Sequence, residues 1–191
     1  MSDAPLNVLM ICGSLRKGSF NRKLMNALPA LAPEEMKLTD SPSIGNLPLY
    51  NQDIQTESGD PPEVKALVKL VDDADGVIIV SPEYNWSIPG VMKNAIDWLS
   101  RVKEDPLAEK PVAIQSAAPG LLGGSRMQYH LRQSLTSVEA LMLIRPEIIV
   151  NLAAKKFDVN TGELTDQPTR DLIKQQLAEF VKFIRRGGGK A

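Results

Sequence analysis

Short, entirely apolar stretches alternate with segments of helical periodicity along most of the chain. Three such stretches, at residues 8–12, 77–80 and 112–114, are bounded by turn residues and accompanied by helical patterns. A run of consecutive apolar residues is typical of a strand that is buried on both faces. Alternation of such strands with amphipathic helices predicts a parallel sheet with helices on both faces, joined by right-handed crossovers.

The spacing of apolar residues predicts five amphipathic helices. They fall at residues 20–31, 64–71, 91–99, 127–138 and 173–184. The second is expected to begin with Asp60 as its N-cap, followed by a proline at the first helical position and Glu63 at the third. Weaker strand patterns at residues 36–39 and 143–150 complete a set of five strands.

This pattern favours an α/β fold, a doubly wound five-stranded parallel sheet with the flavodoxin-like order 2-1-3-4-5, over a six-stranded dinucleotide-binding arrangement. In that order, ligands bind beyond the carboxyl ends of the strands, near the switch between strands 1 and 3. The loops after residues 12, 80 and 114 are therefore the expected positions of a site. Residues 158–163 have the composition of a surface turn before the last helix.

The composition narrows the class of protein. The 191 residues are expected to form a single domain over residues 1–191, with residues 187–191 as a flexible tail. The net charge of −1 gives no basic excess for a nucleic-acid partner. One cysteine and one histidine exclude a disulfide framework and a multi-histidine site, so no metal is expected. No apolar run approaches ~20 residues and the first residues lack a signal-peptide pattern, which predicts a cytoplasmic protein without membrane insertion.

The first loop, residues 13–23, runs from a buried strand into a helix. This geometry points free backbone N–H groups and the positive end of a helix dipole at an anion. Ser14, Ser19 and Asn21 add neutral donors and Arg16 adds a planar cation, which suits a phosphate monoester. The glycine spacing resembles a P-loop without its lysine, and no G-x-G-x-x-G follows the strand, so neither triphosphate hydrolysis nor a dinucleotide clamp is supported. An ordinary polar turn is the alternative.

The second loop, residues 81–90, contains two prolines that stiffen it and a cluster of polar and aromatic side chains. Asn85 and the backbone could read the polar edge of a flat heterocycle, while Tyr84 or Trp86 covers an apolar face. Glu83 adds a carboxyl group to the same crevice. The alternative places Trp86 in the core and leaves Tyr84 as a surface ring.

The third loop, residues 116–125, is rich in small residues and carries little side-chain chemistry. Small side chains let backbone groups approach a ring system closely, so contact with the same ligand is expected, with Ser116 and Ala118 as candidates. A flexible connection to the next helix is the alternative.

Four motifs in these regions resemble the signatures of the NADPH-dependent FMN reductase family. They are GSLRKGSFN at residues 13–21, PEYN at residues 82–85, PG at residues 89–90 and KNAIDWLS at residues 93–100. Within that family, the sequence most resembles the bacterial chromate and quinone reductases. The resemblance runs in order from about residue 8 to the last helix.

The resemblance implies an FMN cofactor, NADPH or NADH as electron donor, and a homodimer or homotetramer. The first loop would hold the FMN phosphate, and the second would hold the isoalloxazine ring with help from the third. The implied cofactor-binding residues are Ser14, Leu15, Arg16, Lys17, Gly18, Ser19, Phe20, Asn21, Pro82, Glu83, Tyr84, Asn85, Trp86, Ser116 and Ala118. Because the flavin carries the chemistry, no catalytic side chain is expected.

The expected activity is hydride transfer from NAD(P)H through FMN to quinones, chromate, azo compounds or free flavin. Two alternatives are a flavodoxin-like electron carrier and a redox-responsive flavoprotein that acts by binding a partner. The near-neutral charge speaks against the first, because electron carriers of that type resemble a more acidic design.

Four residues outside the loops have expected roles. Arg101, in the last turn of its helix, is a candidate for attracting anionic acceptors or the nucleotide phosphate across a subunit interface, although a cation there also favours the helix dipole. Trp98 and Cys12 are expected in the core, and His130 in a structural or interface role. Candidate polar contacts in a higher assembly are Arg126, Tyr129 and Glu147.

Overall fold

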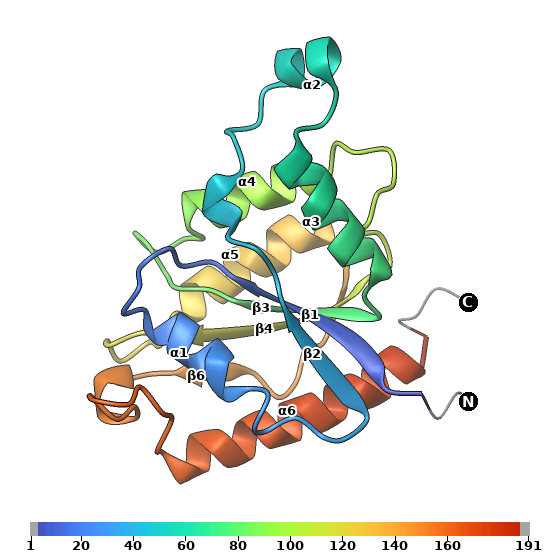
Figure 1. Ribbon diagram of the computed structural model, residues 1–191. Helices are drawn as coiled ribbons and strands as arrows, with labels where there is room; N and C mark the ends of the chain where they lie inside the picture. Colours follow the sequence, from blue (N-terminus) through green and yellow to red (C-terminus); the bar gives the residue numbers. More distant parts are fainter. Residues whose placement is uncertain (1–3, 188–191) are drawn as a thin grey trace.

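One parallel sheet lies at the centre of the structure, with helices on both of its faces (Figure 1). The computed structural model describes residues 4–187. The strands are β1 (Leu6–Cys12), β2 (Met36–Asp40), β3 (Gly76–Val80), β4 (Pro111–Ala117), β5 (Leu141–Met142) and β6 (Ile148–Val150). Their order is β2-β1-β3-β4-β5, β6 also pairs with β4, and every pairing is parallel. The predicted fold class and strand order are confirmed.

The last position of the sheet differs from the single strand expected over residues 143–150. Two short strands, β5 and β6, pair with successive parts of β4, and residues 143–147 interrupt them. Pro146 has no N–H to donate to a strand ladder, so the pairing breaks there. Side chains bind the freed carbonyl groups instead: Arg132 donates to Leu143 at 3.3 Å and Gln176 donates to Pro146 at 2.7 Å.

Each central strand buries side chains on both faces, as its continuous apolar pattern predicts. In β1, Leu9 and Ile11 join the core beneath α3, α4 and α5, whereas Val8 and Met10 join the core beneath α1 and α6. Figure 1 shows these two helical layers on opposite sides of the sheet. The helices are α1 (Phe20–Ala27), α2 (Gln52–Ser58), α3 (Pro62–Asp73), α4 (Gly90–Leu99), α5 (Ser125–Thr136) and α6 (Gln167–Arg185).

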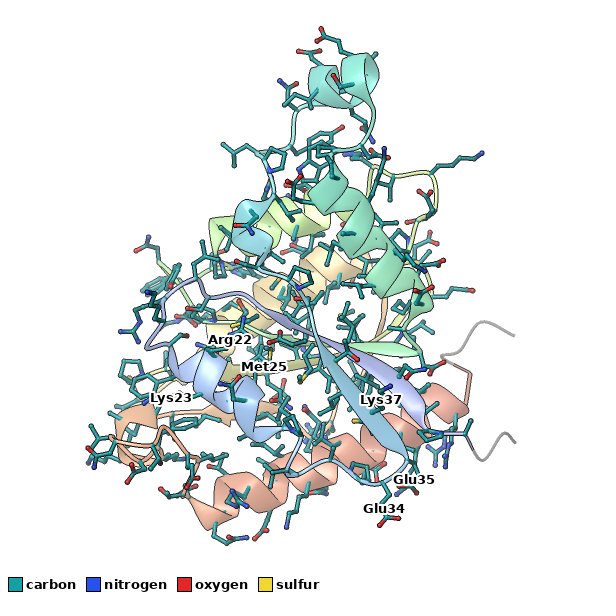
Figure 2. The ribbon with its side chains drawn as sticks, in the orientation of Figure 1. Arg22, Lys23, Met25, Glu34, Glu35 and Lys37 are labelled. Atoms are coloured by element: carbon teal, nitrogen blue, oxygen red, sulfur yellow. The ribbon has the colours of Figure 1, made fainter. Side chains whose placement is uncertain are left out.

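Helix α1 lies closest to the first loop. Its Leu24 and Met25 are fully buried (Met25 and Arg22 are labelled in Figure 2). A guanidinium nitrogen of Arg22 lies 2.7 Å from a carboxylate oxygen of Asp40 at the end of β2, which ties α1 to that strand. The helix ends at Ala27, earlier than the pattern over residues 20–31 predicts.

Two further helices correct the sequence predictions. Helix α3 has Pro61 as its N-cap without a side-chain hydrogen bond, because the carboxylate of Asp60 accepts from Gln55 at 2.7 Å instead of capping the helix. The sequence did not predict helix α2. None of its residues is buried, so its sequence lacks the periodic apolar residues that indicate a helix. It projects from the body of the molecule at the top of Figure 1.

The three loops singled out by the sequence all follow the carboxyl ends of β1, β3 and β4, which are neighbours in the sheet. Residues 158–163 form a surface turn closed by the Phe157–Leu164 bridge, as predicted. Apart from Gly187, the predicted tail lies outside the described residues. No helix within residues 4–187 is long and apolar enough to cross a membrane.

Candidate active site

The first loop leaves β1 and enters α1 at this carboxyl edge. Ser19 is the N-cap of α1, and its hydroxyl oxygen accepts a hydrogen bond from the N–H of Asn21 at 3.2 Å. The backbone N–H groups of residues 14–18 take part in none of the hydrogen bonds found within residues 4–187. The side chains of Ser14 and Ser19 are buried. The loop therefore offers a row of unused donors at the positive end of a helix.

The cations of this loop face solvent. Arg16 and Lys17 are exposed, and neither forms an ion pair with another described residue. A Cβ built on Gly18 would meet nothing within 4 Å, so the space beside the loop is open. Positive charge and open space next to free N–H groups suit an anionic ligand.

Two apolar side chains of the first segment pack against protein instead. Leu15 packs against Gly45 in the η1 turn (Ile44–Asn46). A Cβ on Gly45 would lie 2.6 Å from a methyl group of Leu15, so this contact requires a glycine. The ring of Phe20 lies 5.9 Å from the ring of Phe157. Both side chains thus contact other parts of the chain, and Leu15 keeps 54% of its surface exposed.

The first and second loops begin in close contact. A Cβ on Gly13 would lie 2.3 Å from the hydroxyl oxygen of Ser81, a clash that only glycine avoids. Its N–H donates to the carbonyl of Val80 at 2.9 Å, which extends the β1–β3 pairing by one residue. The two loops therefore leave the sheet side by side.

The second loop contains a tight turn at residues 84–87. Tyr84 and Ser87 exchange two backbone hydrogen bonds at 3.0 Å, and Asn85 and Trp86 between them have φ values of 50° and 68°. Positive φ at both central residues is the type I′ arrangement. The N–H groups of these two residues have no partner within residues 4–187. Trp86 is 66% exposed, so its alternative assignment to the core is wrong.

Contacts with α5 hold this turn in place. The carboxylate of Glu83 accepts from the N–H of Met127 in the first turn of α5 at 3.1 Å. Arg126 lies 3.9 Å from the same carboxylate, and its guanidinium carbon lies 4.3 Å from the centre of the Trp86 ring. His130 shares a hydrogen bond with the hydroxyl of Ser87 at 2.9 Å.

The third loop is bound to the end of the sheet by its backbone. The N–H of Ala118 donates to Val150 at 3.0 Å, and its carbonyl accepts from Ala153 at 3.1 Å. Ser116 is fully buried and accepts from the side chain of Gln128 at 2.9 Å. These contacts make the start of the loop rigid, so its interpretation as a flexible connection does not hold for this part.

Asn21 uses both ends of its amide inside the protein. Its Nδ2 donates to the carbonyl of Ala117, and its Oδ1 accepts from the N–H of Ala117, each at 2.9 Å. The direct phosphate contact expected from the sequence is therefore not the arrangement of this side chain, which points to the end of β4.

Comparisons with known proteins decide the family. Residues 6–155 match the sequence model of the NADPH-dependent FMN reductase family, which is most of the chain. The chain belongs to this family. Its members use FMN with NAD(P)H, and this protein is an FMN-dependent NAD(P)H oxidoreductase.

Similar proteins cover nearly the whole chain. A quinone reductase of Escherichia coli (strain K12) is 49% identical over 181 residues, which is 95% of this chain and 96% of that protein. An NAD(P)H-dependent FMN reductase of Pseudomonas aeruginosa is 41% identical, covering 97% and 98% of the two chains. Among solved structures, the flavoenzyme NAD(P)H:(acceptor) oxidoreductase FerB of Paracoccus denitrificans superimposes with a TM-score of 0.86 at 33% identity, covering 95% of this chain and 98% of that one.

The edge of the sheet fits the cofactor of the FMN reductase family. FMN carries one phosphate monoester and a planar ring with polar edges. The first loop has N–H groups at residues 14–18 and a cation, Arg16, without a partner among the described residues, together with buried hydroxyls, and these donors suit the phosphate. The turn at residues 84–87 has two further N–H groups that no described residue binds, beside exposed aromatic rings, which suits the ring.

Arg101 is not brought together with the three loops within this chain. It follows α4, whose first residue is Gly90, and a helix of this length places its ends roughly 15 Å apart. Its carbonyl accepts from Gln55 at 2.9 Å, and it lies along a polar groove of about 470 Å³ with Lys93 and Glu139.

The remaining sequence predictions concern structural residues. Trp98 is fully buried and donates its indole N–H to Pro48 at 2.7 Å, as a core residue should. Cys12 is buried, and burial raises the pKa of its thiol, which donates to the carbonyl of Ser14 at 3.6 Å.

The residues proposed as contacts in a higher assembly have varied surroundings. Arg126 contacts the second loop, as described above. Tyr129 is 62% exposed, and Glu147 lies 3.7 Å from Arg132. Their role in an assembly stays a prediction.

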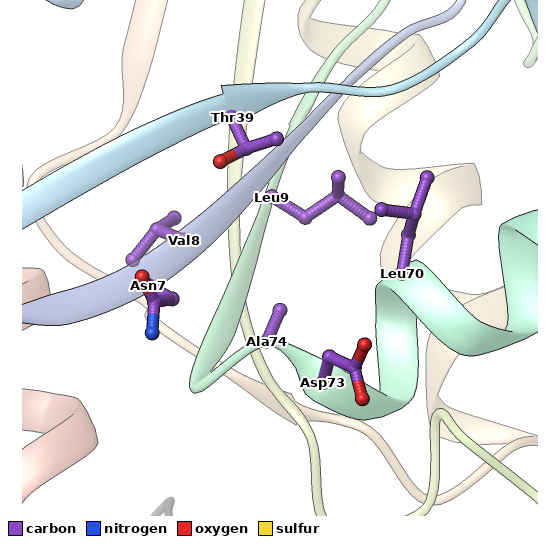
Figure 3. Close-up of a pocket in the computed structure, with 7 residues that line it drawn as sticks. All are labelled: Asn7, Val8, Leu9, Thr39, Leu70, Asp73 and Ala74. Carbon is purple, nitrogen blue, oxygen red and sulfur yellow. The ribbon is translucent and has the colours of Figure 1, made fainter.

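A separate small cavity of about 190 Å³ lies away from the three loops (Figure 3). Asn7 and Leu9 from the first half of β1, Thr39 from β2, and Leu70 and Ala74 near the end of α3 line it. Its lining comes from the opposite half of β1 to the one that enters the first loop, so it is not part of the candidate site.

Sequence reasoning missed the partners of the polar side chains in the loops. Glu83 caps α5 from 44 residues away, and Asn21 binds a backbone group 96 residues away. The residue types signalled polar chemistry at the edge of the sheet where the three loops meet. No local pattern could identify those partners, because they come together only in the folded chain.

Proposed function

We propose that this protein is a quinone reductase that uses FMN and NAD(P)H. The observation that carries the proposal is the set of unpaired N–H groups at residues 14–18 and 85–86, which lie on loops that leave neighbouring strands at one edge of the sheet. Donors that no described group satisfies, next to exposed aromatic rings, favour a ligand with both an anionic group and a flat ring.

The first loop is assigned to the phosphate of FMN. Its backbone N–H groups and the hydroxyl protons of Ser14 and Ser19 would donate to the phosphate oxygens, and Arg16 would add a charge-assisted contact. The residues proposed for this subsite are Ser14, Leu15, Arg16, Lys17, Gly18 and Ser19, with Phe20 and Asn21 holding the segment in place.

The second and third loops are assigned to the ring. The N–H groups of Asn85 and Trp86 would meet its polar edge, and Tyr84 would lie beside it. Pro82, Glu83, Ser116 and Ala118 would fix the backbone around it. Bound FMN would supply the redox chemistry between NAD(P)H and an acceptor. The protein groups bind and orient the reactants and need form no covalent bond.

Quinones are the acceptor class with the most support. Similar proteins carry the names quinone reductase in Escherichia coli and 2-hydroxy-1,4-benzoquinone reductase in Burkholderia sp., at 49% and 37% identity. Exposed apolar side chains on the second and third loops, Tyr84, Trp86, Leu121 and Leu122, suit a flat, partly apolar acceptor. Chromate, azo compounds and free flavin stay predicted acceptors.

Steady-state kinetics test this function. Purified full-length protein loaded with FMN is mixed with NADH or NADPH and 1,4-benzoquinone, and the loss of NAD(P)H absorbance is followed. A quinone reductase consumes many equivalents of NAD(P)H per protein. An electron carrier or a partner-binding flavoprotein that does not accept hydride from NAD(P)H would leave the rate equal to that of the same mixture without protein, and that result would refute the proposal.

Three further expectations belong to the same proposal. A dimer or tetramer is expected, and light scattering that shows only monomer at micromolar concentration would contradict it. The cytoplasm is the proposed location, since the reaction consumes NAD(P)H.

Arg101 is proposed to attract anionic acceptors. Arg101→Ala should lose more kcat/KM with chromate than with a neutral quinone, and the difference between the two losses should shrink in high salt.

A further inference from the structure

The side chain of Asn21 is the best-defined polar group between two of the loops. Asn21 lies in the first turn of α1 and is 2% exposed. Its amide forms two hydrogen bonds of 2.9 Å with the N–H and the carbonyl of a single residue, Ala117, the last residue of β4. A donor and an acceptor on one side chain thus match a donor and an acceptor on one backbone residue.

The course of the sheet explains why Ala117 needs this partner. The carbonyl of Gln115 accepts from the N–H of Ser81 at 3.0 Å, so Gln115 directs its backbone groups toward β3. Backbone groups of alternate strand residues point to the same side, so Ala117 also faces that side. Strand β3 ends at Val80, however, and its paired register with β4 stops at Gln115, two residues before Ala117. The Asn21 amide takes the position of the missing strand.

This contact connects two parts of the proposed FMN site. The backbone N–H of Asn21 donates to the hydroxyl of Ser19, the N-cap residue at which the first loop enters α1. Its side chain holds Ala117, and the next residue, Ala118, begins the third loop and is bound to Val150 on its other side. The chain from the first loop to the third is therefore continuous through hydrogen bonds.

We propose that Asn21 is a positioning residue that couples the first loop to the third, so that the phosphate end and the ring end of the FMN site are held in one arrangement. The proposal rests on the proposed function, in which these loops bind the two ends of FMN. Without the Asn21 amide, the buried N–H and carbonyl of Ala117 lose their partners, and the end of β4 has to move to find others.

A ligand pair separates coupling from direct contact with phosphate. Riboflavin has the ring of FMN but no phosphate group. A side chain that only contacts phosphate affects FMN and leaves riboflavin binding unchanged. A side chain that holds both loops in place affects the two ligands alike, because each then binds to a site that is less well organised.

The experiment titrates full-length protein, stripped of flavin, with FMN and with riboflavin, and follows the quenching of flavin fluorescence. Asn21→Ala is expected to weaken the binding of both flavins by about tenfold or more. Arg16→Ala is the matched control and should weaken FMN binding alone. If Asn21→Ala weakens only FMN, or neither flavin, the coupling role is overturned.

Asn21→Asp serves if the alanine variant does not fold. Aspartate keeps an acceptor for the N–H of Ala117 but places a carboxylate against its carbonyl, so the binding of both flavins should weaken. In direct contact with phosphate, the same charge would repel FMN and spare riboflavin, which would overturn the proposal. Repulsion between the carboxylate and the carbonyl of Ala117 should also displace the end of β4 and weaken the N–H bond. Amide exchange at Ala117 in the flavin-free protein should therefore be faster in Asn21→Asp and unchanged in Arg16→Ala, and equal rates in these two variants and the wild type would also overturn the proposal.

The Arg16→Ala control tests the assignment of the first loop to phosphate separately from the role of Asn21. If Arg16→Ala does not discriminate between FMN and riboflavin, the assignment of the first loop to phosphate fails, and with it that part of the proposed function. The exchange rate at Ala117 still reports whether Asn21 holds the end of β4, because that measurement needs no flavin.

Discussion

Replacing Glu83 by alanine removes a helix cap that comes from a distant loop. Helix α5 begins after Gly124, which has a φ of 94° and no side chain to cap the helix. The carboxylate of Glu83 supplies the missing acceptor, at 3.1 Å from the N–H of Met127. The same carboxylate places a negative charge at the positive end of the α5 dipole, which is favourable.

The size of the effect follows from these contacts. Loss of a side-chain cap costs about 0.5–2 kcal/mol, and the charge at the helix end adds a few tenths to ~1 kcal/mol to the same interaction. The Arg126 contact contributes little, because its nitrogen lies 3.9 Å away and that side chain is 43% exposed. We expect a loss of about 1.5 kcal/mol, which lowers the Tm of a chain of this size by roughly 3–6 °C.

Thermal unfolding of flavin-free protein measures this loss without a contribution from cofactor binding. Glu83→Gln keeps an oxygen acceptor for Met127 and removes the charge, so it should recover more than half of the lost stability. Arg126→Ala should change the free energy of unfolding by about 0.5 kcal/mol, the value of an exposed cation–π contact. If Glu83→Ala unfolds at the same temperature as the wild type, the capping argument is refuted.

Three other perturbations have defined outcomes. Gly13→Ala should lower both the Tm and the amount of FMN bound, because the new Cβ would lie 2.3 Å from the hydroxyl oxygen of Ser81 in the second loop. In Gly18→Ala the new Cβ has no described neighbour within 4 Å, so the Tm should not change. Asp166 caps α6, and a hydrogen bond from the Thr169 hydroxyl is the main cause that lowers its pKa. Its carboxylate therefore stabilises the fold above the unfolded pKa of ~3.9, and this stability is lost as pH falls through the lower folded pKa. In urea unfolding, the free energy of unfolding should be lower for Asp166→Asn than for the wild type at about pH 7, and the two values should be equal at about pH 2. Cys12 is buried and its pKa is raised, so iodoacetamide should modify it in urea-unfolded protein and only slowly in the folded protein.

The sequence by itself determined the elements that depend on short-range patterns. Consecutive apolar residues marked β1, β3 and β4 because each strand is covered on both faces, and any such strand needs the same composition. The alternation with helices then placed the three polar loops at one edge of the sheet, since parallel strands joined by crossovers share their carboxyl ends. The shared edge of the three loops therefore followed from local information, and their binding of FMN stays a prediction.

The tertiary structure decided which groups these loops contact. The sequence predicted contacts with the ligand for Asn21 and Glu83. The folded chain turns both side chains toward backbone groups of the protein. It also split the last strand at Pro146 and placed the ring of Trp86 in solvent. A local sequence pattern shows whether a residue is apolar or can form hydrogen bonds. It does not show which group the residue will contact, because a polar side chain can bind many different partners. The partner is selected only when residues 44 or 96 positions apart meet, because each buried donor and acceptor must then be satisfied by whatever group lies beside it.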